Sequence, residues 1–215
     1  LYTKIDNSVY FVAGGLSMPQ VSEKYIESRK NMIAISAINV FAKKGYSNTS
    51  MRDIMNEAKI SRGGLYAHFE NIDSVFIEVL KYEDSLQANQ LLNPDLNKPL
   101  LPQLNDWSCE IVLSIQNTET NLIRAKSEFF LSHNIEDVPY LRERHEKLSQ
   151  NIQQFITVGV EKGEFKKQID VISFSELLIS MIDGVMLHQY YQYSFDTNLV
   201  QIISLMNNMI ENILT

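Results

Sequence analysis

The chain has 215 residues, 45% of them hydrophobic, and a formal net charge of −7. This length can bury a substantial core, in one large domain or in two unequal ones. Eight glycines and five prolines are few enough to exclude a collagen-like or low-complexity chain. The single cysteine, Cys109, excludes a disulfide within the chain, and we expect it to be an apolar packing residue in a reducing cytoplasm.

Opposite charges separate along the chain. Residues 18–70 carry eight Lys/Arg and five Asp/Glu, a net charge of +3, whereas residues 71–215 carry ten and twenty, a net charge of −10. Because attraction to phosphate depends on the local field, a basic segment can bind nucleic acid even in an acidic protein. The pattern favours nucleic-acid binding by the first part, although a chance segregation of surface charge gives the same totals.

The first seventeen residues show no helical period. Residues 1–17 are mildly apolar and contain Gly14-Gly15, and Met18-Pro19 resembles a natural start. We expect residues 1–17 to be a vector-derived or disordered leader, with a native N-terminal arm as the alternative. No apolar stretch reaches the ~18 residues of a transmembrane helix and no segment resembles a secretory signal, so no membrane contact is expected.

Helical periodicity dominates the rest of the chain, and strand patterns are scarce. Ile33, Ala37, Val40 and Phe41 share one face of a helix predicted over 22–44, which Gly45 ends. Residues 92–102 contain three prolines and are predicted to form a loop. Further helices are predicted at 50–57, 61–67, 71–90, 103–117, 119–133, 138–162, 169–193 and 197–214. The predicted fold class is therefore all-α.

The segment from 50 to 67 has the helix, short turn, helix spacing of a helix-turn-helix. Ser50 and Asp53 form a predicted capping box, and Ser61 caps the second helix. Each glycine of Gly63-Gly64 costs a helix roughly 1 kcal/mol relative to alanine, but the missing Cβ atoms allow a close approach to DNA. The alternative is that the pair is simply a turn. The residues predicted to contact DNA are Thr49, Ser50, Arg52, Ser61, Arg62, Gly63, Gly64, Tyr66 and His68.

Two runs in this segment resemble the DNA-binding signature of the TetR (tetracycline-repressor-like) family. They are Ser50-Met51-Arg52-Asp53-Ile54 and Ala58-Lys59-Ile60-Ser61-Arg62-Gly63-Gly64-Leu65-Tyr66-Ala67-His68-Phe69, and Val40-Phe41 and Lys44-Gly45-Tyr46 add to them. The resemblance is close here and loose in the rest of the chain. It implies an all-α homodimer, with a three-helix DNA-binding domain over 18–70 and a helical effector-binding and dimerisation domain over 71–215. The family usually has a phosphate-contacting lysine where this chain has Ile72, so the resemblance also implies one lost ionic contact.

The last two predicted helices carry apolar stripes that are wider than the core of one chain needs. We expect them to pair in a four-helix dimer interface, with burial inside one subunit as the alternative. Gly184 would permit a close approach of helices. The predicted interface residues are Leu178, Met181, Ile182, Val185, Ile202, Met206, Met209 and Ile213.

A ligand pocket is harder to place, because methionine and aromatic residues at helical spacing are usually core. Polar side chains among apolar ones are more informative, since a buried polar group needs a partner. The aromatic stretch from 186 to 195 fits an apolar ligand or a dimer interface equally well. The candidate ligand-binding residues are Trp107, Glu110, Phe129, His133, Phe155, Met186, Gln189 and Tyr190.

These patterns predict a DNA-binding transcriptional regulator, a repressor that releases a palindromic operator when a small molecule binds the second domain. Its partners would be double-stranded operator DNA, a second copy of the chain and an unidentified effector. The chain contains no phosphate-binding glycine loop and no His-Glu-x-x-His or Glu-x-x-His pattern, so we predict no enzyme activity, catalytic residues, cofactor or metal. The alternatives are a helical protein-interaction module, which leaves Gly63-Gly64 unexplained, and a regulator without a small-molecule effector.

Overall fold

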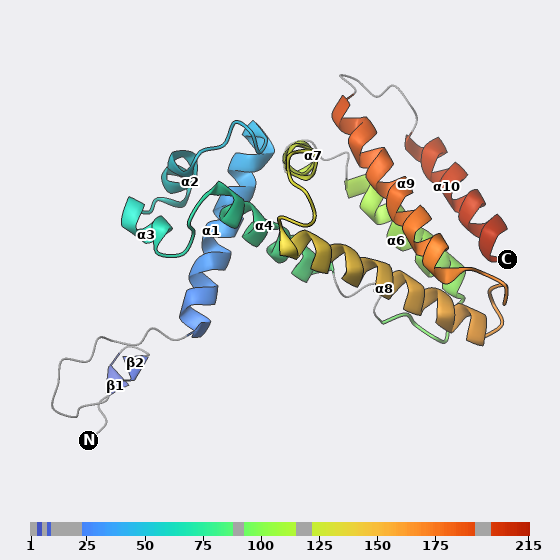
Figure 1. Ribbon diagram of the computed structural model, residues 1–215. Helices are drawn as coiled ribbons and strands as arrows, with labels where there is room; N and C mark the ends of the chain where they lie inside the picture. Colours follow the sequence, from blue (N-terminus) through green and yellow to red (C-terminus); the bar gives the residue numbers. More distant parts are fainter. Residues whose placement is uncertain (1–3, 6–7, 10–22, 88–92, 115–121, 192–198) are drawn as a thin grey trace. The chain divides into compact units, whose positions relative to one another are not determined.

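A computed structural model of the protein describes residues 4–5, 8–9, 23–87, 93–114, 122–191 and 199–215. The chain forms two compact units, unit 1 (Leu1–Ala37 with Ser50–Tyr82) and unit 2 (Ile38–Thr49 with Glu83–Thr215). Helices make up most of both units (Figure 1), which confirms the predicted all-α class. The units differ from the predicted division after residue 70 in two segments, 38–49 and 71–82.

The predicted leader contains two very short strands. β1 (Lys4–Ile5) and β2 (Ser8–Val9) pair antiparallel, with Lys4 opposite Val9 and Ile5 opposite Ser8. The remainder of residues 1–17 lies outside the described residues.

Unit 1 contains the predicted helix-turn-helix. The helices of unit 1 are α1 (Glu23–Lys44) up to Ala37, α2 (Met51–Ala58), α3 (Arg62–Tyr66) and α4 (Ile72–Gln87) up to Tyr82. The helix-turn-helix consists of α2 and α3. The helices of unit 1 bury one apolar face each, and this burial is the main source of their stability. The buried side chains are Ile33, Ala34, Ala37, Ile54, Leu65, Phe69, Val75, Phe76, Val79 and Leu80.

The helix ends of unit 1 follow from local sequence. Lys59 ends α2 in the left-handed conformation, at φ 53° and ψ 44°, and its N–H donates to the Met55 carbonyl. This conformation is uncommon for a residue with a Cβ atom. At the start of α4, Asn71 Oδ1 accepts from the Ser74 N–H at 2.9 Å, and Ser74 Oγ accepts from the Asn71 N–H at 3.2 Å. Residues at the helix ends themselves therefore set where α2 stops and where α4 begins.

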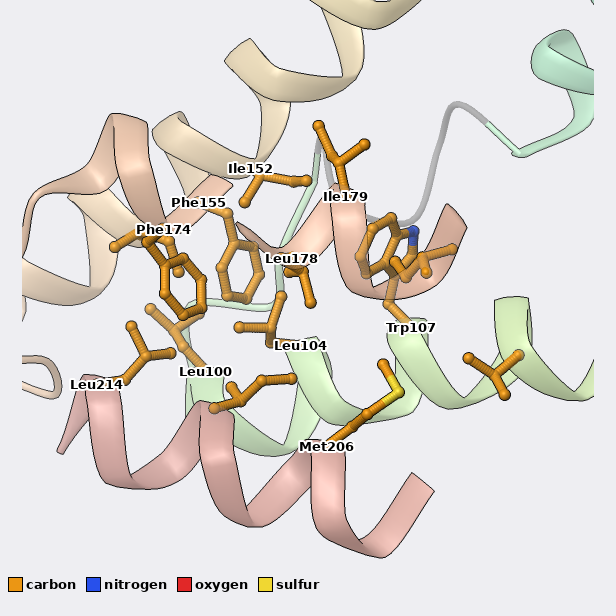
Figure 2. Packing of buried hydrophobic residues seen from close by; sticks show 14 of the residues in the cluster. Leu100, Leu104, Trp107, Ile152, Phe155, Phe174, Leu178, Ile179, Met206 and Leu214 are labelled. Atoms are coloured by element: carbon orange, nitrogen blue, oxygen red, sulfur yellow. The ribbon is translucent and has the colours of Figure 1, made fainter. Parts of the chain in front are cut away.

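Unit 2 contains five further helices. They are α6 (Leu100–Ser114), α7 (Ile123–Ser132), α8 (Pro139–Glu161), α9 (Val171–Tyr191) and α10 (Leu199–Leu214). In Figure 1, α6, α9 and α10 run side by side; α6 packs against both of the others, and α7 and α8 pack against α9. Figure 2 shows the core between these helices, where Leu104, Phe155, Leu178 and Met206 come from four different helices.

The connection from α8 to α9 depends on two glycines. Gly163 has φ +76°, which favours glycine, and it ends α8 as predicted. Within α8, a Cβ atom on Gly159 would overlap the ring of Phe165. The chain can therefore fold back directly onto α8, and Phe165 is buried there at 4% exposure.

The start of α6 differs from the sequence prediction. The helix begins at Leu100, inside the loop predicted over 92–102. The Leu100 N–H donates to Glu164 Oε2 at 2.6 Å, so the cap comes from a residue far away in the sequence. Pro102 lies in the first turn, where the absence of its N–H removes no helical hydrogen bond.

Candidate DNA-binding surface and effector cavity

Two serines position the helix-turn-helix. Ser50 Oγ accepts from the Asp53 N–H at 3.3 Å and Asp53 Oδ2 accepts from the Ser50 N–H at 3.0 Å, which confirms the predicted capping box. Ser50 Oγ also donates to Asp53 Oδ2 at 2.7 Å, so this hydroxyl is committed to the cap. Ser61 Oγ accepts from the Gly64 N–H at 3.1 Å and keeps its own hydrogen for another acceptor.

The outward face of α3 presents Arg62 and Tyr66. The guanidinium carbon of Arg62 lies 5.4 Å from the centroid of the Tyr66 ring, a cation–π distance. Both side chains are exposed, Tyr66 at 45% of its surface. The pair therefore offers one charged and one neutral donor on the same side of a short helix.

Gly63 and Gly64 lie between these side chains and are helical, not part of a turn. The glycines with positive φ among the described residues are Gly45 and Gly163. A Cβ atom on Gly63 would meet nothing within 4 Å, and one on Gly64 would be in ordinary contact with Ser61 Oγ at 3.4 Å. Packing among the described residues therefore requires neither glycine, and the alternative interpretation of a turn is wrong.

The other residues predicted to contact DNA differ in how far they are exposed to solvent. Arg52 is exposed on α2, and His68 is half-buried after α3. Thr49 needs a correction, because it is 8% exposed and its Oγ1 donates to the Gly45 carbonyl at 2.6 Å, in unit 2. Its hydroxyl holds the turn after α1 together. Ile72, where the family usually has lysine, is the half-buried first residue of α4.

Unit 2 contains a cavity of about 220 Å³. Residues from the end of α4 and from α6, α7, α8 and α9 line it. The apolar lining residues are Trp107, Ile111, Ile123, Phe130, Leu148, Ile179, Ile182 and Met186, and the polar ones are Asp84, Ser114, Lys126, Tyr140, Glu143, Arg144, Lys147, Asn151 and Asp183. An apolar wall with a few polar groups is typical of small-molecule sites.

An ion-pair cluster at this cavity holds the end of α4. Arg144 Nε donates to Asp84 Oδ2 at 2.8 Å and to Oδ1 at 3.0 Å, and the Tyr140 hydroxyl donates to Asp84 Oδ2 at 2.7 Å. Lys126 Nζ lies 2.8 Å from Glu83 Oε2. Burial, and then the hydrogen bond to Asp84, raise the pKa of the Tyr140 hydroxyl well above its ordinary value. These contacts tie α4 to α7 and α8.

These contacts leave out two lining carboxylates, the exposed Glu143 on α8 and Asp183 on α9. Among the described residues Asp183 makes no hydrogen bond and no ion pair. Its side chain is open to the cavity, yet enough protein surrounds the carboxylate for burial to raise its pKa, an effect that Arg144 and His145 oppose without cancelling. Arg144 and His145 act on it from beyond ion-pair distance, and each of them is paired with another acid, Asp84 and Glu176 respectively.

The cavity takes in part of the ligand set predicted from sequence. Trp107 and Met186 line it. Phe155 is buried in the core, and Glu110 is exposed outside the lining. The side chains of Gln189 and Tyr190 lie outside the described residues.

Phe129 and His133 belong to a separate aromatic cluster. Their rings stack with centroids 4.1 Å apart, and Tyr46 packs edge-on against Phe129 at 4.9 Å. His133 Nδ1 lies 2.9 Å from the Phe129 carbonyl oxygen, so a local partner satisfies this nitrogen. The cluster attaches the turn that follows α1 to helix α7. Phe129 and His133, which the sequence predicted to bind a ligand, therefore have a packing role here.

The ligand-binding residues predicted from sequence do not include Asp84, Tyr140, Arg144 or Asp183. One pattern could have identified Asp183, because it is an acid within the long apolar helix α9. The other three form their cluster from helices about sixty positions apart, which a single sequence does not reveal.

Helices α9 and α10 were predicted to form the dimer interface, but most of the residues predicted for it face the core of this chain. Leu178, Ile182 and Met206 are buried in the core of this chain, at 1%, 9% and 5% exposure. Met181, Val185, Ile202 and Ile213 pack partly buried against the same core, and Met209 is 48% exposed. The periodicity identified the helices, but it did not distinguish the inner stripe from the outer one. The exposed apolar residues of α9 and α10 are Ile172, Leu177, Val200, Leu205 and Met209.

The apolar composition of α9 is marked. Val171–His188 has the length and apolarity of a membrane-spanning helix, and 22% of this window is buried inside the chain. One helix of this kind says little about a membrane, because core helices have the same composition. The low burial does show that much of α9 has no partner within the described chain.

Comparisons with known proteins agree with this architecture. Residues 35–79 match the family described as bacterial regulatory proteins, tetR family, and residues 103–202 match the tetracyclin repressor-like C-terminal domain. The uncharacterized HTH-type transcriptional regulator YfiR of Bacillus subtilis is 21% identical over 175 residues, covering 80% of this chain and 85% of the relative. The HTH-type transcriptional regulator QacR of Staphylococcus aureus is 24% identical over 187 residues, covering 83% and 92%.

Solved structures share the fold. A TetR-family transcriptional regulator from Pectobacterium atrosepticum superposes with a TM-score of 0.71 at 16% identity, covering 91% of this chain and 98% of that one. AibR, solved in complex with isovaleryl coenzyme A and operator DNA, gives a TM-score of 0.62 at 16% identity, covering 84% and 97%.

A capped helix-turn-helix in one unit and a helical second unit define a DNA-binding transcriptional regulator. The chain belongs to the TetR family. Proteins of this family bind operator DNA, act as dimers and bind small-molecule effectors.

Proposed function

We propose that this chain is a repressor whose dimer binds a pseudo-palindromic operator through α3 and releases it when a small molecule occupies the cavity of unit 2. The main support for the DNA-binding part of this proposal is the helical glycine Gly63. It costs helix stability, and a Cβ atom there would meet nothing within 4 Å. A glycine without a packing reason inside the chain is best explained by the close approach of a partner outside it.

The proposed contacts to DNA come from both helices of the motif. Arg62 and Tyr66 reach the bases or the adjacent phosphates, and Gly63 and Gly64 let the helix backbone approach them. Ser61 and Arg52 contact phosphate. Ser50 contributes through its cap, and His68 lies at the edge of the surface. Thr49 is left out of this set because its hydroxyl is committed to Gly45.

The proposed dimer interface uses the exposed stripes of α9 and α10. Leu177 on α9 and Leu205 and Met209 on α10 are 43%, 63% and 48% exposed. A second copy of the chain would bury them in an isologous four-helix contact. We favour this partner over lipid because the apolar window of α9 also carries Glu176 and Asp183. A dimer would also place two copies of α3 on two half-sites.

The release step follows from the position of α4. This helix supplies residues to both units, and its end is held by Asp84 and Glu83 at the cavity. A ligand that binds better when this end has moved would favour a second state with lower operator affinity. This mechanism contains no catalytic step, and we propose that it operates in the cytoplasm, where a regulator meets its operator.

A double substitution tests the recognition helix. Arg62→Ala with Tyr66→Ala should abolish operator binding in a gel-shift assay, because both reaching side chains of α3 are lost. The circular dichroism spectrum and the dimer should be unchanged, since both residues are exposed. Lys98→Ala with Lys166→Ala, two exposed residues of unit 2, serves as the control and should bind as the parent does. Retained operator binding by the α3 variant would refute this assignment and favour a protein-interaction module.

A further inference from the structure

We infer that the cavity of unit 2 takes a small apolar molecule with a single positive charge, and that Asp183 is its counter-ion. This inference rests on the proposed effector cavity and names the chemical class of its ligand. It depends on which charges of the lining are already paired, on the apolar surroundings of Asp183, and on the size of the cavity.

Two of the three basic residues of the lining, Arg144 and Lys126, are already paired, and the third, Lys147, is exposed on α8. Arg144 donates to both oxygens of Asp84, and Lys126 lies against Glu83. Apart from the exposed Lys147, an anionic ligand would reach a cation only by displacing one of these carboxylates, and it would lie near Asp84 and Asp183, which repel it. A cationic ligand needs no such exchange, because Asp183 makes no ion pair among the described residues. Burial raises the pKa of Asp183 by more than Arg144 and His145 lower it, so these two groups do not fully compensate the carboxylate.

Asp183 stands among apolar residues of the cavity wall. Ile179 precedes it by one helical turn and Met186 follows it by nearly one, and all three line the cavity. Trp107 on α6 and Ile179 on α9, both labelled in Figure 2, belong to the same buried cluster and line the same cavity. A ligand with an apolar body on Trp107 and Ile179 could bring its charged end to Asp183.

The aromatic lining suits a cation as well. Trp107, Phe130 and Tyr140 contribute rings to the wall. The Arg144 guanidinium carbon already lies 5.9 Å from the centroid of Phe130, so a positive charge is accommodated against one ring here. Tryptophan attracts cations most strongly of the three ring types. A cation in the cavity therefore has a carboxylate and an electron-rich face available, whereas the lining cation left to an anion is the exposed Lys147.

The size of the cavity limits the ligand. Its volume of about 220 Å³ is below the roughly 300–1,000 Å³ of drug-sized pockets. An arylalkylammonium ion with one ring fits this class. We choose 3-phenylpropylammonium as the probe, with 3-phenyl-1-propanol as its neutral analogue and 3-phenylpropionate as its anionic analogue.

Trp107 provides the readout, because it is the single tryptophan of the chain and lines the cavity. We expect 3-phenylpropylammonium to change its fluorescence saturably, with a dissociation constant at least about tenfold below that of the alcohol. In Asp183→Asn the ammonium ion should lose this advantage while the alcohol binds as before. Replacing a carboxylate that makes no ion pair with an amide of equal size should leave the fold intact, which thermal unfolding checks.

Glu143→Gln is the matched control, because Glu143 is another lining carboxylate and is exposed on α8. It should keep most of the preference for the cation. The inference is overturned if the anion or the alcohol binds as tightly as the ammonium ion, if Asp183→Asn keeps the preference, if Glu143→Gln loses it equally, or if no probe gives saturable binding.

The operator gel shift separates this inference from the proposed function. If the anion binds and releases operator DNA, the cation inference fails while the proposed effector response stands. If the ammonium ion binds through Asp183 but operator binding is unchanged, the ligand class stands and the release mechanism fails.

Discussion

The two units of this protein are specified over different distances in the sequence. In unit 1, Ser50 and Asp53 cap α2, Ser61 caps α3, and each partner lies three residues away. In unit 2, Leu100 is capped by Glu164 and Asp84 is held by Arg144. The DNA-binding part can therefore be recognised in one sequence, whereas the cavity becomes visible only when distant helices come together.

The helical glycines extend this comparison. Gly159 in α8 has a packing reason inside the chain, because the Phe165 ring occupies the space of its Cβ atom. Gly63 in α3 and Gly184 in α9 have nothing within 4 Å of that space. We interpret the first as a contact within a unit, and the other two as places where the units meet partners, DNA for unit 1 and a second subunit for unit 2.

The largest expected effect is on assembly. Leu205→Glu with Met209→Glu places two charges on the exposed stripe of α10, and the dimer should dissociate because neither charge could be paired across the interface. Analytical ultracentrifugation should show a monomer, and operator binding should be lost. Leu96→Glu with Leu131→Glu, at exposed leucines outside α9 and α10, should leave the dimer intact. A dimer that persists in the α10 variant would contradict the proposed interface.

The next effect is on stability in unit 2. Asp84→Ala leaves Arg144 and Tyr140 without their acceptor, and we expect a loss of about 2–3 kcal/mol in the free energy of unfolding, somewhat below the range for fully buried pairs because the pair retains some solvent access. Urea unfolding measures it. Asp84→Ala combined with Arg144→Leu should recover part of the loss, since no uncompensated charge remains. Equal losses in the single and double variants would show that Asp84 acts alone.

The sequence predicted the helices and the caps of unit 1 because their causes are local. It missed the start of α6 at Leu100, since the capping group Glu164 belongs to another segment. It placed Thr49 on the DNA surface because the polar run around it resembles a loop, whereas the side chain bonds to Gly45. In unit 2 it predicted Trp107 and Met186 as ligand-binding residues, and both line the cavity, but it did not predict the cluster around Asp84. Apolar periodicity shows that a face is buried, but it does not show which core, cavity or subunit buries it.

The smallest expected change in stability is at Gly63 and Gly184, where a Cβ atom would meet nothing within 4 Å. Substitutions there test most directly the comparison of these two glycines with Gly159. Gly63→Ala and Gly184→Ala should each raise the free energy of unfolding by up to about 1 kcal/mol, because alanine is the better helix former and its Cβ atom meets no described atom. Gly159→Ala should lower it by about 1–3 kcal/mol, because Phe165 must move.

Operator binding and dimerisation should distinguish Gly63→Ala from Gly184→Ala. Gly63→Ala should weaken operator binding at least about tenfold, because the new methyl group lies on the surface that approaches DNA. Gly184→Ala should bind operator normally once dimeric, but its dimer should dissociate at higher protein concentrations than the parent. If Gly63→Ala gains stability and keeps its operator affinity, the absence of a Cβ atom at this position has no role in recognition. The assignment of α3 would then depend on Arg62 and Tyr66 alone.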